Sequence, residues 1–100
     1  MTTYHLTIIT PNGKLFDDQA VSLTAPGSEG SLGILAGHTE MVVRLGKGVL
    51  EIKTPQEQKY FAMDSGVLEV DTKSNVLVLA DTALPAENRD LAFQRVKDWS

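Results

Sequence analysis

The chain has no cysteine among its 100 residues and only two histidines. The missing thiols exclude a disulfide framework, a thiolate zinc site and a cysteine nucleophile. A metal site on His5 or His38 would need further carboxylate ligands, and the two histidines do not have metal-ligand spacing. We therefore expect no metal site, and we interpret His5 as a half-exposed strand residue.

A surplus of basic residues and a long apolar run are missing as well. Nine Lys and Arg stand against 13 Asp and Glu, which gives a net charge of −4, whereas nucleic-acid binding needs cations that displace counterions from phosphates. The longest purely aliphatic run, residues 76–80, is far shorter than a bilayer span. The first residues show no basic region followed by an apolar stretch. We expect no nucleic-acid partner, no membrane span and no signal peptide.

Short β-like runs separated by turn residues dominate what is present. A chain of this length forms one domain, and regularly spaced strands with turn chemistry between them are typical of a sandwich or barrel. The Asn12-Gly13 turn predicts a first hairpin, and residues 46–48 predict a second. The expected strands cover residues 4–10, 15–16, 21–25, 31–35, 41–45, 49–54, 59–64, 67–71 and 76–80.

Alternation of apolar and polar residues predicts which side of one strand is buried, and a second strand shows no such alternation. Leu50 and Ile52 should share one face, while Glu51 and Lys53 share the other. In residues 76–79 every side chain is aliphatic, so both faces of that strand should be covered. It is predicted to lie in the middle of the protein, or to meet a partner with its outer side.

The chain changes character near its end. Pro85 could open a helix, at the position where a missing N–H costs nothing. Ala92, Val96 and Trp99 would then form one narrow apolar stripe. A helix of about 13 residues is marginal unless such a stripe packs on something. We therefore divide the chain into a β-sandwich and a short C-terminal helix, residues 1–84 and 85–100.

Two constellations could in principle carry chemistry. Ser65, His38 and Asp64 form a catalytic triad on paper, but the serine lacks the Gly-x-Ser-x-Gly frame that exposes a nucleophile. The glycine-rich residues 27–33 lack the Gly-Lys-Ser/Thr ending of a phosphate-binding loop. Their spacing fits a plain surface loop and a partner-binding loop equally well.

Four motifs, in order, resemble one protein family. The first, at residues 27–38, reads Gly-Ser-Glu-Gly-Ser-Leu-Gly-Ile-Leu-Ala-Gly-His and resembles a signature of the epsilon subunit of F-type rotary ATP synthases. Residues 45–52 are similar to the hairpin that follows it in that family, residues 65–70 to its Gly-Gly-x-Leu-Glu-Val segment, and residues 76–83 to its last strand and exit. With the opening residues 4–6, the resemblance covers nearly the whole expected sandwich.

The resemblance implies a ten-stranded β-sandwich in the central rotor, with no catalytic residues and no cofactor of its own. Family members bind the gamma subunit and the c-ring, and they couple proton or sodium flow to ATP synthesis. For this chain we expect a peripheral place at the cytoplasmic face of a bacterial inner membrane. The C-terminal helix is the part that could reach the alpha and beta subunits. By the resemblance, the residues at the c-ring are Ser28, Glu29, Gly30, Ser31 and Leu32, and those at gamma are Thr10, His38 and Val43.

Some residues depart from the family's pattern. Ala36 replaces a proline, Ser65 replaces the first of two glycines, and Ser31 stands where many relatives carry an acid. Any charge-based contact with the ring therefore depends on Glu29. The family's two-helix tail is represented by one expected helix, and its acidic-x-x-Arg-Ala pattern, which binds ATP in some members, is missing around residues 88–93. We expect weak inhibition of ATP hydrolysis, or none.

Two functions of other classes stay open at this point. A stand-alone β-barrel module could bind carbohydrate or oligonucleotide, although the six aromatic residues are scattered and give no stacking platform for bases. A small hydrolase would depend on the paper triad described above. Binding to an ATP synthase complex that lacks this subunit would separate the rotor function from both alternatives.

Overall fold

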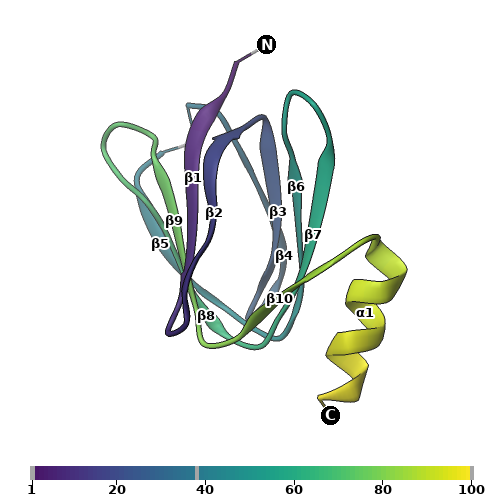
Figure 1. Ribbon diagram of the computed structural model, residues 1–100. Coiled ribbons are helices and arrows are strands. Elements are labelled where there is room, and N and C mark those ends of the chain that lie inside the picture. Colours follow the sequence, from purple (N-terminus) through teal and green to yellow (C-terminus); the bar gives the residue numbers. More distant parts are fainter. Residues whose placement is uncertain (1, 38, 100) are drawn as a thin grey trace.

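The computed structural model describes residues 2–37 and 39–99, and this part of the chain forms ten strands and one helix (Figure 1). In chain order these are β1 Tyr4–Thr10, β2 Gly13–Ala20, β3 Ser22–Gly27, β4 Gly30–Leu35, β5 Met41–Leu45, β6 Gly48–Lys53, β7 Gln58–Met63, β8 Gly66–Val70, β9 Val76–Ala80, β10 Ala83–Ala86 and α1 Arg89–Asp98.

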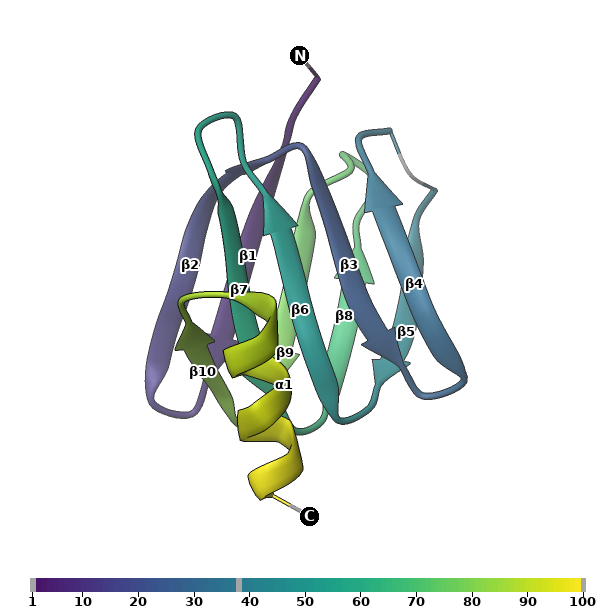
Figure 2. The same cartoon turned by 90° about the vertical axis from the view of Figure 1, so that its right-hand side faces the viewer.

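The ten strands of the described residues belong to one hydrogen-bonded sheet that folds over on itself. Its order is β10-β7-β6-β3-β5-β8-β9-β1-β2, and β4 pairs with β3 off this path. One layer contains β10, β7, β6, β3 and β4, and the other contains β5, β8, β9, β1 and β2 (Figure 2). Strand β3 reaches β5 through a single pair, Gly27 with Leu45. The expected ten-stranded β-sandwich is confirmed.

Aliphatic side chains fill the space between the two layers. In β6, Leu50 and Ile52 are buried while Lys53 is exposed, as the alternation predicted. Tyr4 of β1 donates a hydrogen bond to the carbonyl of Ile34 in β4, at 2.8 Å, and so links the layers. Burial raises the pKa of the Tyr4 phenol above its usual range. The largest fully buried side chains are Leu6, Ile8, Leu23, Ile34, Leu45, Leu50, Ile52, Met63, Leu68, Val70 and Val78.

Residues 46–48 form a crossover between the layers, and the predicted second hairpin is wrong. Strand β5 pairs with β8, whereas β6 pairs with β3 and β7. The crossover passes so close to β3 that a Cβ on Gly48 would lie 2.5 Å from the Cβ of Pro26. The Gly46 amide donates to the Pro26 carbonyl at 2.7 Å. Glycine is required here because the backbone passes close to β3, and not because a tight two-residue turn needs it.

The C-terminal helix begins four residues later than predicted. Pro85 lies inside β10, which pairs only with β7 among the described strands, and a sheet edge tolerates a residue without an N–H. Asn88 caps α1, because its side-chain oxygen accepts from the Leu91 amide at 2.9 Å. The prediction that Pro85 opens the helix is therefore wrong.

Helix α1 packs on the layer that contains β6, β7 and β10. The apolar stripe predicted from helical spacing is confirmed, since its members face a small second cluster. Arg89 also reaches across to Glu51 of β6, with Nη2 2.6 Å from Oε1. The tail thus docks on its own sandwich. The cluster consists of Val49 and Ala62 from the strands and Ala92, Val96 and Trp99 from the C-terminal segment, with Tyr60 and Ala86 beside them.

Gly66, the first residue of β8, offers a test of the close packing between β8 and β9. A Cβ at this position would lie 2.1 Å from the carbonyl oxygen of Leu79 in β9. We expect Gly66→Ala to lose more than about 2 kcal/mol of stability, since backbone must shift, and to melt roughly 10 °C lower. In Gly33→Ala the new Cβ meets nothing within 4 Å, so the change should stay within about 0.5 kcal/mol. Thermal and urea unfolding measure both, and equal stability of the two variants would contradict the close approach.

Candidate functional site

The layer made of β5, β8, β9 and β1 points its outer side away from α1 (Figure 1). Strand register aligns its outward side chains into two rows across four strands. We call these eight residues the outer face. The first row is Arg44, Val67, Leu79 and Ile9, and the second is Val42, Glu69, Leu77 and Thr7.

The centre of the outer face is apolar and partly open. Val42 is 70% exposed, Leu79 47% and Val67 39%. A shallow hollow of about 370 Å³ lies beside them, lined by Ile9, Pro11, Val67 and Leu79 among others. Exposed apolar residues that adjoin one another and carry charges at their border are typical of an interaction surface.

Strand β9 explains why this surface is apolar. It lies between β8 and β1, so the predicted middle position is confirmed. Val76 and Val78 are buried in the core, but Leu79 on the other side is half exposed. The expectation that both faces of this strand are covered is therefore wrong for Leu79. Its alternative, an outer side that meets a partner, stays a prediction.

The two described residues predicted at gamma, Thr10 and Val43, do not belong to the outer face. Thr10 is buried, its hydroxyl accepting from the Asn12 amide at 3.1 Å and donating to the Gly13 carbonyl at 3.3 Å. Val43 packs against the core from the inner side of β5. His38 lies outside the described residues. The outward-pointing Val67 and Leu79 were missed, although the unbroken apolar run in β9 was a signal for the second of them.

The residues predicted at the c-ring form the tip of the β3–β4 hairpin. Gly27 pairs with Gly30 and leaves a two-residue turn between them. Gly30 has a φ of +132°, which favours glycine, and a Cβ on Gly27 would lie 2.5 Å from the Gly30 carbonyl oxygen. Leu32 is partly buried against the core. The exposed residues of the set are Ser28, Glu29, Gly30 and Ser31.

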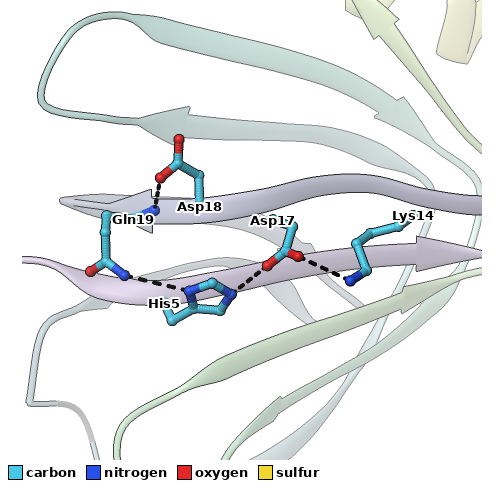
Figure 3. Close-up of polar contacts among 5 residues, drawn as sticks. All are labelled: His5, Lys14, Asp17, Asp18 and Gln19. Atoms are coloured by element: carbon cyan, nitrogen blue, oxygen red, sulfur yellow. Dashed lines mark hydrogen bonds and ion pairs between the residues drawn. The ribbon is translucent and has the colours of Figure 1, made fainter.

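Charged side chains border the outer face on β1 and β2 (Figure 3). Lys14 Nζ lies 2.9 Å from one carboxylate oxygen of Asp17, and His5 Nε2 contacts the other. The hydrogen bond from Lys14, together with that from His5, lowers the pKa of the Asp17 carboxyl below its usual value. Asp17 lies opposite Thr7 in the sheet register, so this cluster extends the second row.

The histidine of the predicted triad, His38, lies outside the described residues, and the Ser65 hydroxyl is directed to an acid other than the predicted Asp64. Ser65 donates its hydroxyl hydrogen to Asp81 at 2.6 Å, and the Asp81 amide donates to the Ser65 carbonyl at 2.8 Å. These bonds brace the connection between β7 and β8. Within residues 2–37 and 39–99, no three His, Asp or Glu side chains gather as a metal site. In the same residues no helix has the length and apolar character that crossing a membrane requires.

Sequence comparison decides between the families that such a sandwich could belong to. Residues 3–86 match the family described as ATP synthase, Delta/Epsilon chain, beta-sandwich domain. The chain belongs to this family. An ATP synthase epsilon chain of Helicobacter pylori (strain G27) is 35% identical over 101 residues, which cover 97% of this chain and 81% of that protein. The epsilon chain of Aliarcobacter butzleri (strain RM4018) is 43% identical over 84 residues, or 84% and 66% of the two chains.

Solved structures share the fold of this epsilon-family chain. A chain of the Euglena gracilis mitochondrial ATP synthase (OSCP/F1/c-ring) superimposes with a TM-score of 0.79 at 24% identity, covering 85% of this chain and 54% of that one. A chain of the Tetrahymena thermophila mitochondrial ATP synthase central stalk and c-ring gives a TM-score of 0.74 at 20% identity, covering 83% and 66%. The resemblance found in the four motifs is confirmed. Both relatives are, by name, epsilon chains of ATP synthase and thus subunits of that complex.

The lowered pKa of Asp17 predicts a pH-dependent contribution to stability. Its carboxylate stabilises the fold above the ordinary pKa of aspartate, and this contribution is lost as the pH falls through the lowered folded-state pKa. Asp17→Asn should therefore be less stable than the parent at pH 7, and the difference should shrink between about pH 5 and pH 2. Urea unfolding across this range measures it. In a Lys14→Met background the effect at pH 7 should be smaller, and an unchanged effect would count against the pair.

Proposed function

We propose that the chain is a non-catalytic rotor subunit of an F-type ATP synthase, which binds the gamma subunit with its outer face and the c-ring with its β3–β4 tip. In this position it couples the translocation of protons or sodium ions to ATP synthesis. The observation that carries the proposal is the row of Ile9, Leu79 and Val67. Three adjacent strands present apolar side chains outward in register there, on the layer away from α1.

The outer face suits a stable partner such as gamma. Interfaces of this kind bury about 800 Å² per partner and combine an apolar centre with a polar rim. Here Arg44 and Glu69 supply charges beside Val67 and Leu79. The resemblance assigns Thr10 and Val43 to gamma, and their strands β1 and β5 are the two borders of this face. We therefore assign the contact to the outward side chains of these strands.

The β3–β4 tip suits the polar loops of a c-ring. Its turn offers one carboxylate, Glu29, and small hydroxyl side chains, Ser28 and Ser31, all exposed. The backbone of this turn has little freedom, because Gly27 and Gly30 on either side of it are paired with each other at the end of the β3–β4 ladder. A rigid, polar, small-residue tip can fit between neighbouring loops without ordering cost.

Transmission of rotation requires a body that deforms little, and the packing provides one. Protein cores have the density of organic crystals and low compressibility. The layers are joined through the shared sheet at Gly27 and Leu45 and through the Tyr4–Ile34 hydrogen bond. A force on the β3–β4 tip is therefore carried into both layers.

The remaining contacts follow from the same arrangement. Helix α1 exposes Leu91 and Phe93, 46% and 47%, while its stripe holds the sandwich. These are the tail's side chains for a contact with the alpha and beta subunits. The chain is then held at the cytoplasmic face of a bacterial inner membrane through its partners, in keeping with its bacterial relatives.

Leu79→Asp tests the gamma contact. A carboxylate in the middle of an apolar interface is buried without a partner, which costs several kcal/mol, so affinity for purified gamma should fall at least about 100-fold. Leu35→Asp is the matched control, because Leu35 is 63% exposed on β4, away from the outer face. It should bind like the parent. Titration calorimetry measures both, with thermal unfolding to show that the variants are folded; equal affinities would exclude the outer face.

Glu29→Lys tests the ring contact. The reversed charge at the tip should lower proton-driven ATP synthesis by reconstituted complex several-fold, while the isolated chain keeps its stability, since exposed substitutions change stability by about 0.5 kcal/mol or less. Glu57→Lys is the control, because Glu57 lies in the exposed β6–β7 turn at the opposite end of the sandwich (Figure 2). Normal synthesis with Glu29→Lys would refute the assignment of the tip.

A further inference from the structure

A chain of side-chain hydrogen bonds runs across β1 and β2, with His5 in the middle (Figure 3). Thr3 donates its hydroxyl hydrogen to Gln19 Oε1 at 2.9 Å. Gln19 Nε2 lies 3.4 Å from His5 Nδ1, and His5 Nε2 contacts Asp17 Oδ1. Lys14 Nζ closes the chain on Asp17 Oδ2 at 2.9 Å.

Each partner of the imidazole determines where its proton sits. An ionised carboxylate only accepts hydrogen bonds, so Asp17 requires a hydrogen on His5 Nε2. Gln19 uses its oxygen for Thr3 and therefore turns its amide hydrogens toward His5. His5 Nδ1 must then offer its lone pair. The arrangement fits one species, the neutral imidazole with its hydrogen on Nε2.

Protonation of His5 removes the lone pair on Nδ1 on which this pattern of hydrogen bonds depends. A solvent proton taken up at His5 Nδ1 would face the amide hydrogens of Gln19, so two donors would point at each other. Rotation of the Gln19 amide by half a turn resolves the conflict. Its oxygen then accepts from His5, and its nitrogen donates to the hydroxyl of Thr3, which accepts as readily as it donates.

Charged groups face His5 from two sides. Strand β2 supplies the carboxylate of Asp17 with the ammonium of Lys14 behind it. On the other side, Glu69 of β8 and Asp71 of the β8–β9 turn line a hollow of about 350 Å³ together with His5. Histidine is the side chain whose charge changes around neutral pH.

We propose that His5 is a pH-sensitive switch at the border of the outer face, whose protonation reverses the hydrogen bonds that join Gln19 of the edge strand β2 to His5 and to Thr3. Strand β2 pairs only with β1 among the described strands, and these side-chain bonds add to the backbone ladder that attaches it there. The two states present different donors and a different charge beside Thr7 and Leu77. The switch resides in the chain itself and can be tested without gamma or the c-ring, so it stands or falls separately from the rotor function.

Nuclear magnetic resonance of the ¹⁵N-labelled 100-residue chain between pH 8.5 and pH 5 tests the proposal. At high pH the ring nitrogens of His5 should show a hydrogen on Nε2 and none on Nδ1. As His5 is protonated, the side-chain amide signals of Gln19 should shift with the same midpoint. A hydrogen on Nδ1 at high pH, or Gln19 signals that ignore the protonation of His5, would overturn the proposal.

Variants of the residues beside His5 test the direction in which its protonation midpoint moves. Gln19→Glu places an acceptor and a negative charge at Nδ1, so the midpoint of His5 should move to higher pH. Asp17→Asn removes the opposing carboxylate and should move it to lower pH. Gln94→Glu makes the same exchange as the first variant on α1 and should leave the midpoint unchanged. Equal midpoints in the Gln19 and Gln94 variants would contradict the assigned contact.

Discussion

The architecture depends on the hydrogen bonding of strand β3 to both layers. Its first half pairs with β6, its full length pairs with β4, and its last residue, Gly27, pairs with Leu45 of β5. One strand therefore closes the sheet on itself and aligns the layers. The crossover at residues 46–48 can pass beside it only because glycine leaves room next to Pro26. This close approach is where the chain passes from the end of β5 in one layer to the start of β6 in the other.

Closure of the sheet gives the two layers different surroundings. The layer with β6, β7 and β10 carries α1, which covers Val49 and Ala62. The layer with β5, β8, β9 and β1 keeps apolar side chains outward, with Leu79 at its centre. The rotor subunit that we propose needs both a stiff interior and an uncovered contact surface. Here the same fold supplies them, because each strand contributes one side to the core and the other to a surface.

Local chemistry explains which parts of the structure could be predicted. The first hairpin, the faces of Leu50 and Ile52, and the apolar stripe of α1 all follow from local sequence, and the structure confirms them, although the two turn residues of the hairpin are Pro11 and Asn12 and Gly13 already belongs to β2. The errors occurred where the same residue types serve distant contacts. The glycines within residues 46–48 predicted a hairpin turn, but in the structure they allow the backbone to pass close to Pro26 of β3. Pro85 read as a helix start, but it sits on a sheet edge.

The sequence by itself determined nine of the ten strand runs, the polar tip at Ser28 and Glu29, and the membership of the epsilon family, since these depend on residue order alone. Only the tertiary structure decided that Thr10 points inward into a turn, that Val67 and Leu79 meet Ile9 in one outward row, and that His5 lies between Asp17 and Gln19. Such relations join strands far apart in the chain. They depend on register and on which layer a strand enters, and neither is encoded in local periodicity.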